Sequence, residues 1–124
     1  MPNADYHTER QPTTSWIKEL KFYEKEIESC ERSLEEIITN IRTTRDLILA
    51  EHFQNQFILQ RYNLRRLKHQ LKWLARGPEE ALQILLEEVR YFIRTFKALL
   101  QEFDRFMAPF FHLQVLPFLA NHPA

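Results

Sequence analysis

The chain of 124 residues contains a single glycine and a single cysteine, and its 17 basic and 17 acidic side chains cancel to a net charge of zero. Phosphate-cradling loops and dinucleotide fingerprints need several glycines, so both are excluded. The lack of glycine also disfavours a β-sandwich or barrel, which needs many tight turns. One cysteine cannot form an intramolecular disulfide, which excludes a disulfide-stapled secreted domain.

The sequence also lacks long uncharged apolar runs. No stretch reaches the about 18 apolar residues of a membrane span. The start of the chain carries Asp5, Glu9 and Arg10 without the apolar run of a signal peptide. Balanced charge disfavours a dedicated nucleic-acid binder, whose affinity comes mainly from excess positive charge. We therefore expect a soluble, cytoplasmic, helical domain without a membrane span.

Three segments carry apolar residues at alternating spacings of three and four, which is the heptad pattern of packed helices. In the first segment these residues are Trp16, Leu20, Tyr23, Ile27, Cys30, Leu34, Ile37 and Ile41. In the second they are Ala50, Phe53, Phe57, Gln60, Leu64, Leu67, Leu71 and Leu74, with one polar member. In the third they are Leu82, Leu85, Val89, Phe92, Phe96, Leu99, Phe103 and Phe106. A second apolar line there, Leu86, Ile93, Leu100 and Met107, predicts the wide buried face of a bundle helix.

Capping and breaking residues separate these segments. Ser15 is a candidate N-cap, and Thr43 with Asp46 resembles a capping box at the start of the second helix. Gly77-Pro78 should end that helix, because glycine tolerates positive φ and proline suits the next first turn. Pro109 should end the third.

The sequence thus predicts an all-α fold, an antiparallel up-down-up bundle of three long helices over 15–42, 44–76 and 78–108. We expect residues 1–14 to form a flexible N-terminal segment. Residues 109–124 should form an apolar C-terminal tail, with a short fourth helix between Pro109 and Pro117 as one alternative.

Three stretches carry a resemblance to a known family. They are Trp16-Ile17-Lys18-Glu19-Leu20-Lys21-Phe22-Tyr23, then Glu51-His52-Phe53-Gln54-Asn55-Gln56-Phe57-Ile58, and the pattern Phe92, Phe96, Leu99, Phe103, Arg105, Phe106. Over about residues 16–107 the chain resembles a family of small uncharacterised helical proteins from Bacteroidota. That resemblance implies a helical fold and a bacterial origin, and it implies no activity. The short Gly77-Pro78 turn and the apolar tail depart from the family pattern.

The second helix should carry apolar residues on the side away from its heptad seam. A three-helix monomer has no use for Ile48, Leu59, Tyr62 and Trp73 there, so something should cover them. One alternative is the chain's own tail, and the other is a second copy of the chain. The candidate interface comprises Ile48, Leu59, Tyr62, Trp73, Phe110, Phe111, Leu116 and Phe118.

The second half of this helix is basic without any acid. Its candidate basic patch comprises Arg61, Arg65, Arg66, Lys68, Lys72 and Arg76. Interleaving with Tyr62 and Trp73 would suit nucleic acid or phosphate. We favour an explanation within the bundle itself. Bases near the end of one helix and acids near the start of the next both interact favourably with the helix dipoles, and the two groups would partly neutralise each other. The acids that open the third helix are Glu79, Glu80, Glu87 and Glu88.

The sequence indicates no catalytic residues, no cofactor and no metal ligands. His52 and His69 fall on the outer side of the second helix, about 25 Å apart along its axis, too far to share a metal. Cys30 occupies a core position, and Gln60 in the seam is expected to fix the register near Ile27 and Thr95. A line of acids on the first helix, including Glu24 and Glu31, is expected to be solvated.

The sequence therefore predicts a non-enzymatic interaction or structural module whose partner is a homodimer copy or another protein. Nucleic-acid or phosphate binding through the basic patch is the alternative. A metal-binding or ligand-binding bundle is a further alternative.

Overall fold

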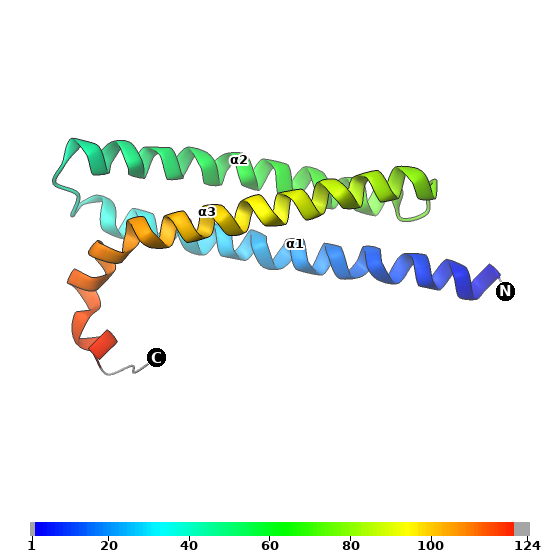
Figure 1. Ribbon diagram of the computed structural model, residues 1–124, viewed down its shortest axis with the longest axis horizontal. Helices are drawn as coiled ribbons and strands as arrows, with labels where there is room; N and C mark the ends of the chain where they lie inside the picture. Colours follow the sequence, from blue (N-terminus) through cyan, green and yellow to red (C-terminus); the bar gives the residue numbers. More distant parts are fainter. Residues whose placement is uncertain (1, 121–124) are drawn as a thin grey trace.

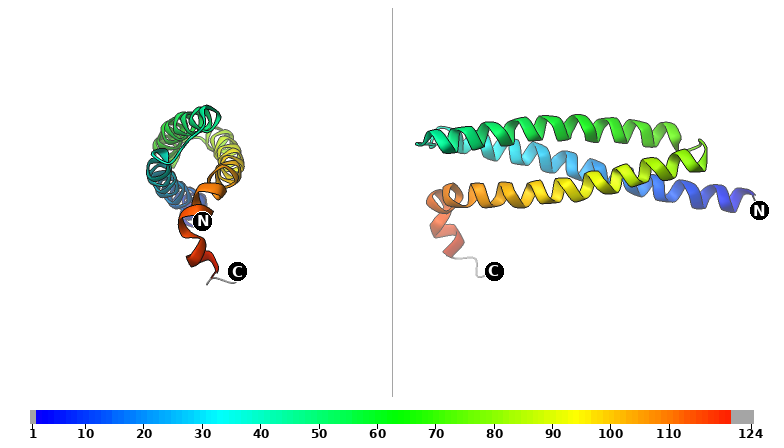
Figure 2. Two further views of the ribbon diagram at one scale, coloured as in Figure 1. Left: turned by 90° about the vertical axis from the view of Figure 1, so that its left-hand side faces the viewer. Right: turned by 45° about the horizontal axis from the view of Figure 1, so that its top comes forward.

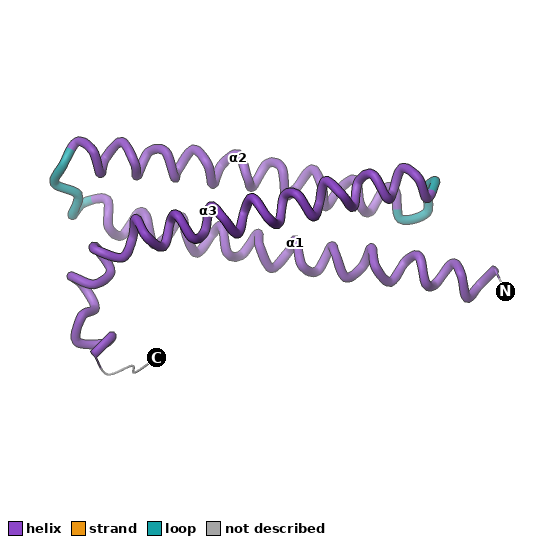
Figure 3. The backbone as a smooth tube through the Cα atoms, in the orientation of Figure 1, coloured by secondary structure: helices purple, strands orange, loops and turns teal. Residues whose placement is uncertain are grey.

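The computed structural model describes the backbone from Pro2 to Ala120 and the side chains of residues 13–110. It contains three α-helices, α1 (Pro2–Ile38), α2 (Thr44–Leu74) and α3 (Glu79–Ala120). Figure 1 shows α2 running opposite to α1 and α3, and Figure 3 shows the short loops that join them. The predicted all-α bundle of three helices is confirmed.

The core consists of side chains from the three predicted seams. The largest of those with almost no exposed surface are Leu20, Ile27, Leu34, Phe57, Leu64, Leu67, Leu71, Val89 and Phe96. From the second apolar line of α3, Leu86, Ile93 and Met107 are also buried, while Leu100 packs against the core at its edge. Heptad spacing therefore located the buried face of each helix.

The central helix of the bundle is α2, which packs closely against both neighbours, whereas α1 and α3 approach each other much less. The end-on view in Figure 2 shows the three helices arranged around a common axis. Large side chains connect α1 to α3: the Tyr23 and Phe96 rings meet edge-on, and the Arg90 guanidinium lies 5.7 Å from the centre of the Trp16 ring. The interface between α1 and α3 thus depends on large aromatic side chains more than on a close approach of the two backbones.

The cap predicted for α2 is present. Thr43 adopts an extended backbone, with φ −113° and ψ 149°, and its hydroxyl accepts a hydrogen bond from the Asp46 backbone N–H at 3.1 Å. The Asp46 carboxylate also lies in the first turn, where it favours the helix dipole. The helix therefore begins at Thr44, as the sequence predicts.

The expected role of Gly77 is wrong. No described residue, Gly77 included, has a positive φ. The Gly77 N–H donates a hydrogen bond to the Leu74 carbonyl at 3.0 Å, which closes the turn after α2 with an ordinary backbone. Space matters more at this position, because an added Cβ would lie 3.0 Å from the Leu74 Cδ2 atom.

The first helix starts earlier than expected, at Pro2 instead of Ser15, so the predicted Ser15 cap is wrong for the described backbone, while the flexibility of residues 1–14 stays a prediction. Pro2 suits a first turn, and Pro12 removes only one backbone hydrogen bond. Tertiary packing holds the last part of this extension, because Thr13 is buried and lines a hollow with Lys72 and Arg76 at the end of α2.

The third helix does not end at Pro109 but continues to Ala120. A proline inside a helix removes one N–H donor and clashes with the preceding turn, so it can bend a helix without ending it. Figure 1 shows the orange-to-red end of α3 bending away from the bundle. The predicted separate tail is instead a bent extension of α3.

Candidate functional site

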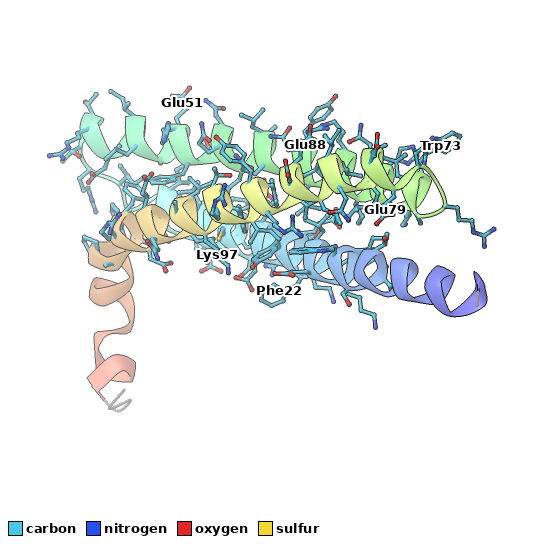
Figure 4. All side chains as sticks on the ribbon, turned by 45° about the vertical axis from the view of Figure 1, so that its right-hand side comes forward. Phe22, Glu51, Trp73, Glu79, Glu88 and Lys97 are labelled. Atoms are coloured by element: carbon cyan, nitrogen blue, oxygen red, sulfur yellow. The ribbon has the colours of Figure 1, made fainter. Side chains whose placement is uncertain are left out.

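The apolar residues predicted on the outer side of α2 are exposed. We call Ile48, Leu59, Tyr62 and Trp73 the outer face of α2; Tyr62 is 68% and Trp73 79% exposed. Figure 4 shows Trp73 projecting from the bundle near the α2–α3 turn. Large exposed apolar side chains gathered on one side of a bundle are typical of a binding surface.

Two apolar residues of α3 extend this surface, and the sequence reasoning missed both. Ile84 is 65% and Tyr91 62% exposed. They lie seven residues apart, outside both apolar lines identified on this helix. That spacing was the available signal, because residues seven apart lie on one side of a helix.

A shallow groove runs between the second half of α2 and the first half of α3. It consists of two adjoining hollows of about 550 and 680 Å³, which share Arg66, Ile84 and Glu88. Trp73 lines one hollow and Tyr91 the other. Between them, the Arg66 guanidinium lies 3.5 Å from the Glu88 carboxylate and also donates to Gln70 at 3.0 Å. The α2–α3 groove therefore has an exposed aromatic side chain in each hollow, with the Arg66–Glu88 ion pair between them.

Among the C-terminal members of the candidate interface, Phe110 has a described side chain, and it does not join the outer face of α2. Phe110 is partly buried against the core, with its ring 5.5 Å from that of Phe106. The side chains of Phe111, Leu116 and Phe118 lie outside the described residues. Phe110 is thus a core-edge residue, because it stands one helical turn beyond Phe106 on the same side of α3.

Most of the candidate basic patch is already paired within the bundle. Arg61 pairs with Glu31, and Glu24 accepts hydrogen bonds from Arg65 and Lys68, both at 2.9 Å. With Arg66 bound to Glu88, four of the six bases have carboxylate partners. Lys72 and Arg76 have none among the described residues. Neutralisation within the bundle explains the charge pattern, as expected. The bases pair mainly with acids of α1, and Glu88 is the partner from α3.

The paired acids of α1 are not the solvated residues that the sequence suggested. The Glu24 side chain is only 18% exposed. Its hydrogen bonds from Arg65, and then from Lys68, lower the pKa of Glu24 below the usual 4.5. Helical periodicity identified the line of acids on α1, but it did not show that Glu24 and Glu31 lie beside the bases of α2.

Cys30 is an inert thiol at the edge of the core. Burial, with smaller effects from the Glu26, Asp104 and Glu31 carboxylates, raises its pKa to about 12. A thiol with so high a pKa is almost fully protonated at neutral pH and is a poor nucleophile.

The polar residue of the α2 seam is half-buried. Gln60 lines the α2–α3 groove with Phe92 and Thr95. Gln60 thus shares a hollow with Thr95, while its proximity to Ile27 and its role in fixing the register stay predictions.

His52 and His69 are both exposed. Within the described range, no three His, Cys, Asp or Glu side chains are placed to hold a metal ion. Over the same range, none of the helices combines the length and apolarity needed to cross a membrane.

No protein-family model, curated protein or solved structure matches the chain. The resemblance to helical proteins of Bacteroidota stays a prediction.

Proposed function

We propose that the chain is a non-enzymatic protein–protein interaction module that binds its partner through the outer face of α2 and the α2–α3 groove. The observation that carries this proposal is the exposure of Tyr62, Trp73, Ile84 and Tyr91 on adjoining helices. Tyrosine and tryptophan dominate binding energy at protein interfaces because they bury a large area with few rotatable bonds.

The charge arrangement supports a protein partner over a polyanion. Arg61, Arg65 and Lys68 are bound to carboxylates of α1, so they have little capacity left for phosphates. Nucleic-acid or phosphate binding has less support for this reason. A fluorescent DNA or RNA duplex tests that alternative through the salt dependence of binding.

The titratable groups support a non-enzymatic role. Ion pairing accounts for the lowered pKa of Glu24, and burial for the raised pKa of Cys30. Neither group has the properties of a general acid or an activated nucleophile near neutral pH.

Photo-crosslinking in the cells that naturally express the chain tests the proposal. A photoreactive phenylalanine analogue replaces Tyr62 or Trp73, and matched controls place it at Phe22 or Lys97. Figure 4 shows Phe22 and Lys97 on the side of the molecule away from Trp73. We expect covalent protein adducts from positions 62 and 73 and few from 22 and 97. Equal labelling from all four positions, or none from 62 and 73, would contradict the proposal.

A further inference from the structure

The α2–α3 groove has opposite charges on its two walls. The α2 wall carries Arg66, and the α3 wall carries Glu87 and Glu88. Apolar side chains flank this charged centre, with Trp73 in one hollow and Tyr91 in the other. An occupant that complements the groove must therefore offer an acidic edge opposite α2, a basic edge opposite α3, and aromatic or aliphatic groups on both sides.

The bent end of α3 lies at the wrong end of the molecule to be that occupant. Trp73 is next to the α2–α3 turn, whereas the last part of α3 leaves the bundle at the opposite end (Figures 1 and 4). Of the two coverings that the sequence suggested, this leaves a second copy of the chain.

We propose that the occupant is a second copy of the chain, related by a two-fold axis that runs along the groove. This inference rests on the proposed function and specifies its partner. Such an axis keeps the helix directions and exchanges the two walls, so α2 lies opposite the partner's α3. Arg66 then faces the partner's Glu88, and the partner's Arg66 faces Glu88. The four charges alternate in sign around a square.

A two-fold axis perpendicular to the helices gives a less favourable arrangement. It places α2 against the partner's α2 and α3 against the partner's α3. When the axis passes at the level of the ion pair, Arg66 meets the partner's Arg66 and Glu88 meets the partner's Glu88. Like charges facing each other across an interface cost free energy. In the alternating square, each charge lies next to charges of the opposite sign. We therefore choose the axis that runs along the groove.

The ion pair also fixes which apolar groups meet. Arg66 and Glu88 define one level along the bundle. Tyr62 is four residues from Arg66, and Tyr91 is three residues from Glu88 in the same axial direction, about 6 and 4.5 Å from that level. In the other direction, Trp73 and Ile84 lie about 10.5 and 6 Å from it. Tyr62 thus faces the partner's Tyr91, and Trp73 approaches the partner's Ile84.

Light scattering over a concentration series tests the dimer on the full chain. We expect a mass approaching twice 15.1 kDa, and Trp73→Ser and Ile84→Ser should each weaken the dimer at least about tenfold. Phe22→Ser and Lys97→Ser on the other side should leave it unchanged. Helicity by circular dichroism confirms that each variant is folded, since all four positions are exposed. A folded monomer at every concentration, or a dimer insensitive to both groove substitutions, overturns the inference.

Cysteine crosslinking tests the direction of the axis. In a Cys30→Ser background, we mix one chain with Tyr62→Cys and a differently tagged chain with Tyr91→Cys, and add a short bis-maleimide. We expect the mixed pair to crosslink much faster than two Tyr62→Cys chains, because α2 faces α3. Faster crosslinking between the two Tyr62→Cys chains overturns the proposed axis.

The photo-crosslinking experiment separates this inference from the proposed function. Adducts from position 73 whose second component is the chain itself support the dimer. Adducts only with a different protein overturn the dimer while the interaction module stands.

Discussion

The Tyr23 ring of α1 meets the Phe96 ring of α3 edge-on, with centroids 5.5 Å apart and planes at 75°. This contact joins the two helices that approach each other least. Phe96 is fully buried and also stacks on Phe92, at 5.8 Å. The side of the bundle opposite α2 therefore depends on a small group of rings.

Phe96→Ala should destabilise the bundle by about 3–5 kcal/mol, because it leaves a cavity where three helices meet. Urea unfolding followed by circular dichroism measures the loss. Phe22→Ala is the matched control, since Phe22 is 56% exposed, and we expect it to cost less than about 1 kcal/mol. A loss for Phe96→Ala as small as that of the control would contradict this account of the core.

Glu24 should make the stability depend on pH in the acidic range. Its pKa in the folded state lies below the unfolded value near 4.5, so the unfolded chain binds the proton more readily. The stabilisation from Glu24 is complete above that value and decreases as the pH falls through the folded pKa. Glu24→Gln should lose about 1–2 kcal/mol at neutral pH and weaken the acid dependence.

Unfolding of the wild type and Glu24→Gln at a series of pH values measures this effect. Glu28→Gln is the control, because Glu28 is exposed on the same helix. Parallel stability curves for the wild type and Glu24→Gln would show that the pairing with Arg65 and Lys68 contributes nothing.

Gly77→Ala should be neutral or stabilise the chain by up to about 1 kcal/mol, because Gly77 has no positive φ and alanine reduces the freedom of the unfolded chain. The new methyl group would lie 3.0 Å from the flexible Cδ2 end of Leu74, which can shift, and at ordinary contact distances of 3.5 and 3.6 Å from the Leu74 backbone. Thermal unfolding measures the change. Destabilisation by more than about 1 kcal/mol would mean that the turn cannot accommodate the methyl group.

Gln60→Leu should raise the stability by up to about 1 kcal/mol, because it places an apolar group at a half-buried seam position beside Phe92. Gln101→Leu on the exposed side of α3 is the control and should change little. A clear loss of stability on Gln60→Leu would show that the amide makes a contact that leucine cannot replace.

Cys30 should react slowly with iodoacetamide in the folded protein. A pKa raised from 9.0 to about 12 lowers the thiolate fraction about a thousandfold around pH 8. The rate should continue to rise with pH well above 9, and denaturant should restore the reactivity of an ordinary thiol. Rapid modification of the folded chain near neutral pH would contradict the burial of Cys30.

The sequence predicted the core and one helix start well, because both depend on short-range patterns. Heptad spacing placed Leu20, Phe57 and Val89 in the interior, and the three-residue separation of Thr43 and Asp46 identified a cap that the structure contains. A residue's place in a heptad fixes which side of its helix it occupies, and the cap needs only neighbouring residues.

The sequence did not predict the pairing of Glu24 with Arg65 and Lys68. That contact depends on the rotation and level of α1 relative to α2, which periodicity alone does not set. The effect of Pro109 was also misjudged, because the effect of a proline depends on the packing around it. For the candidate site, the outer residues Tyr62 and Trp73 were predicted, while Ile84 and Tyr91 of α3 were missed although their seven-residue spacing places them on one side of that helix.

The central position of α2 has a consequence for the order of folding. Most contacts lie within single helices, and the helices pack mainly against their neighbours along the chain, so contacts between distant parts of the sequence are few. Chains with such low contact order fold fast. During synthesis, α1 and α2 can therefore pack together before α3 emerges from the ribosome, through their apolar seams and the ion pairs of Glu24 and Glu31. The third helix then adds the Phe92 and Phe96 rings.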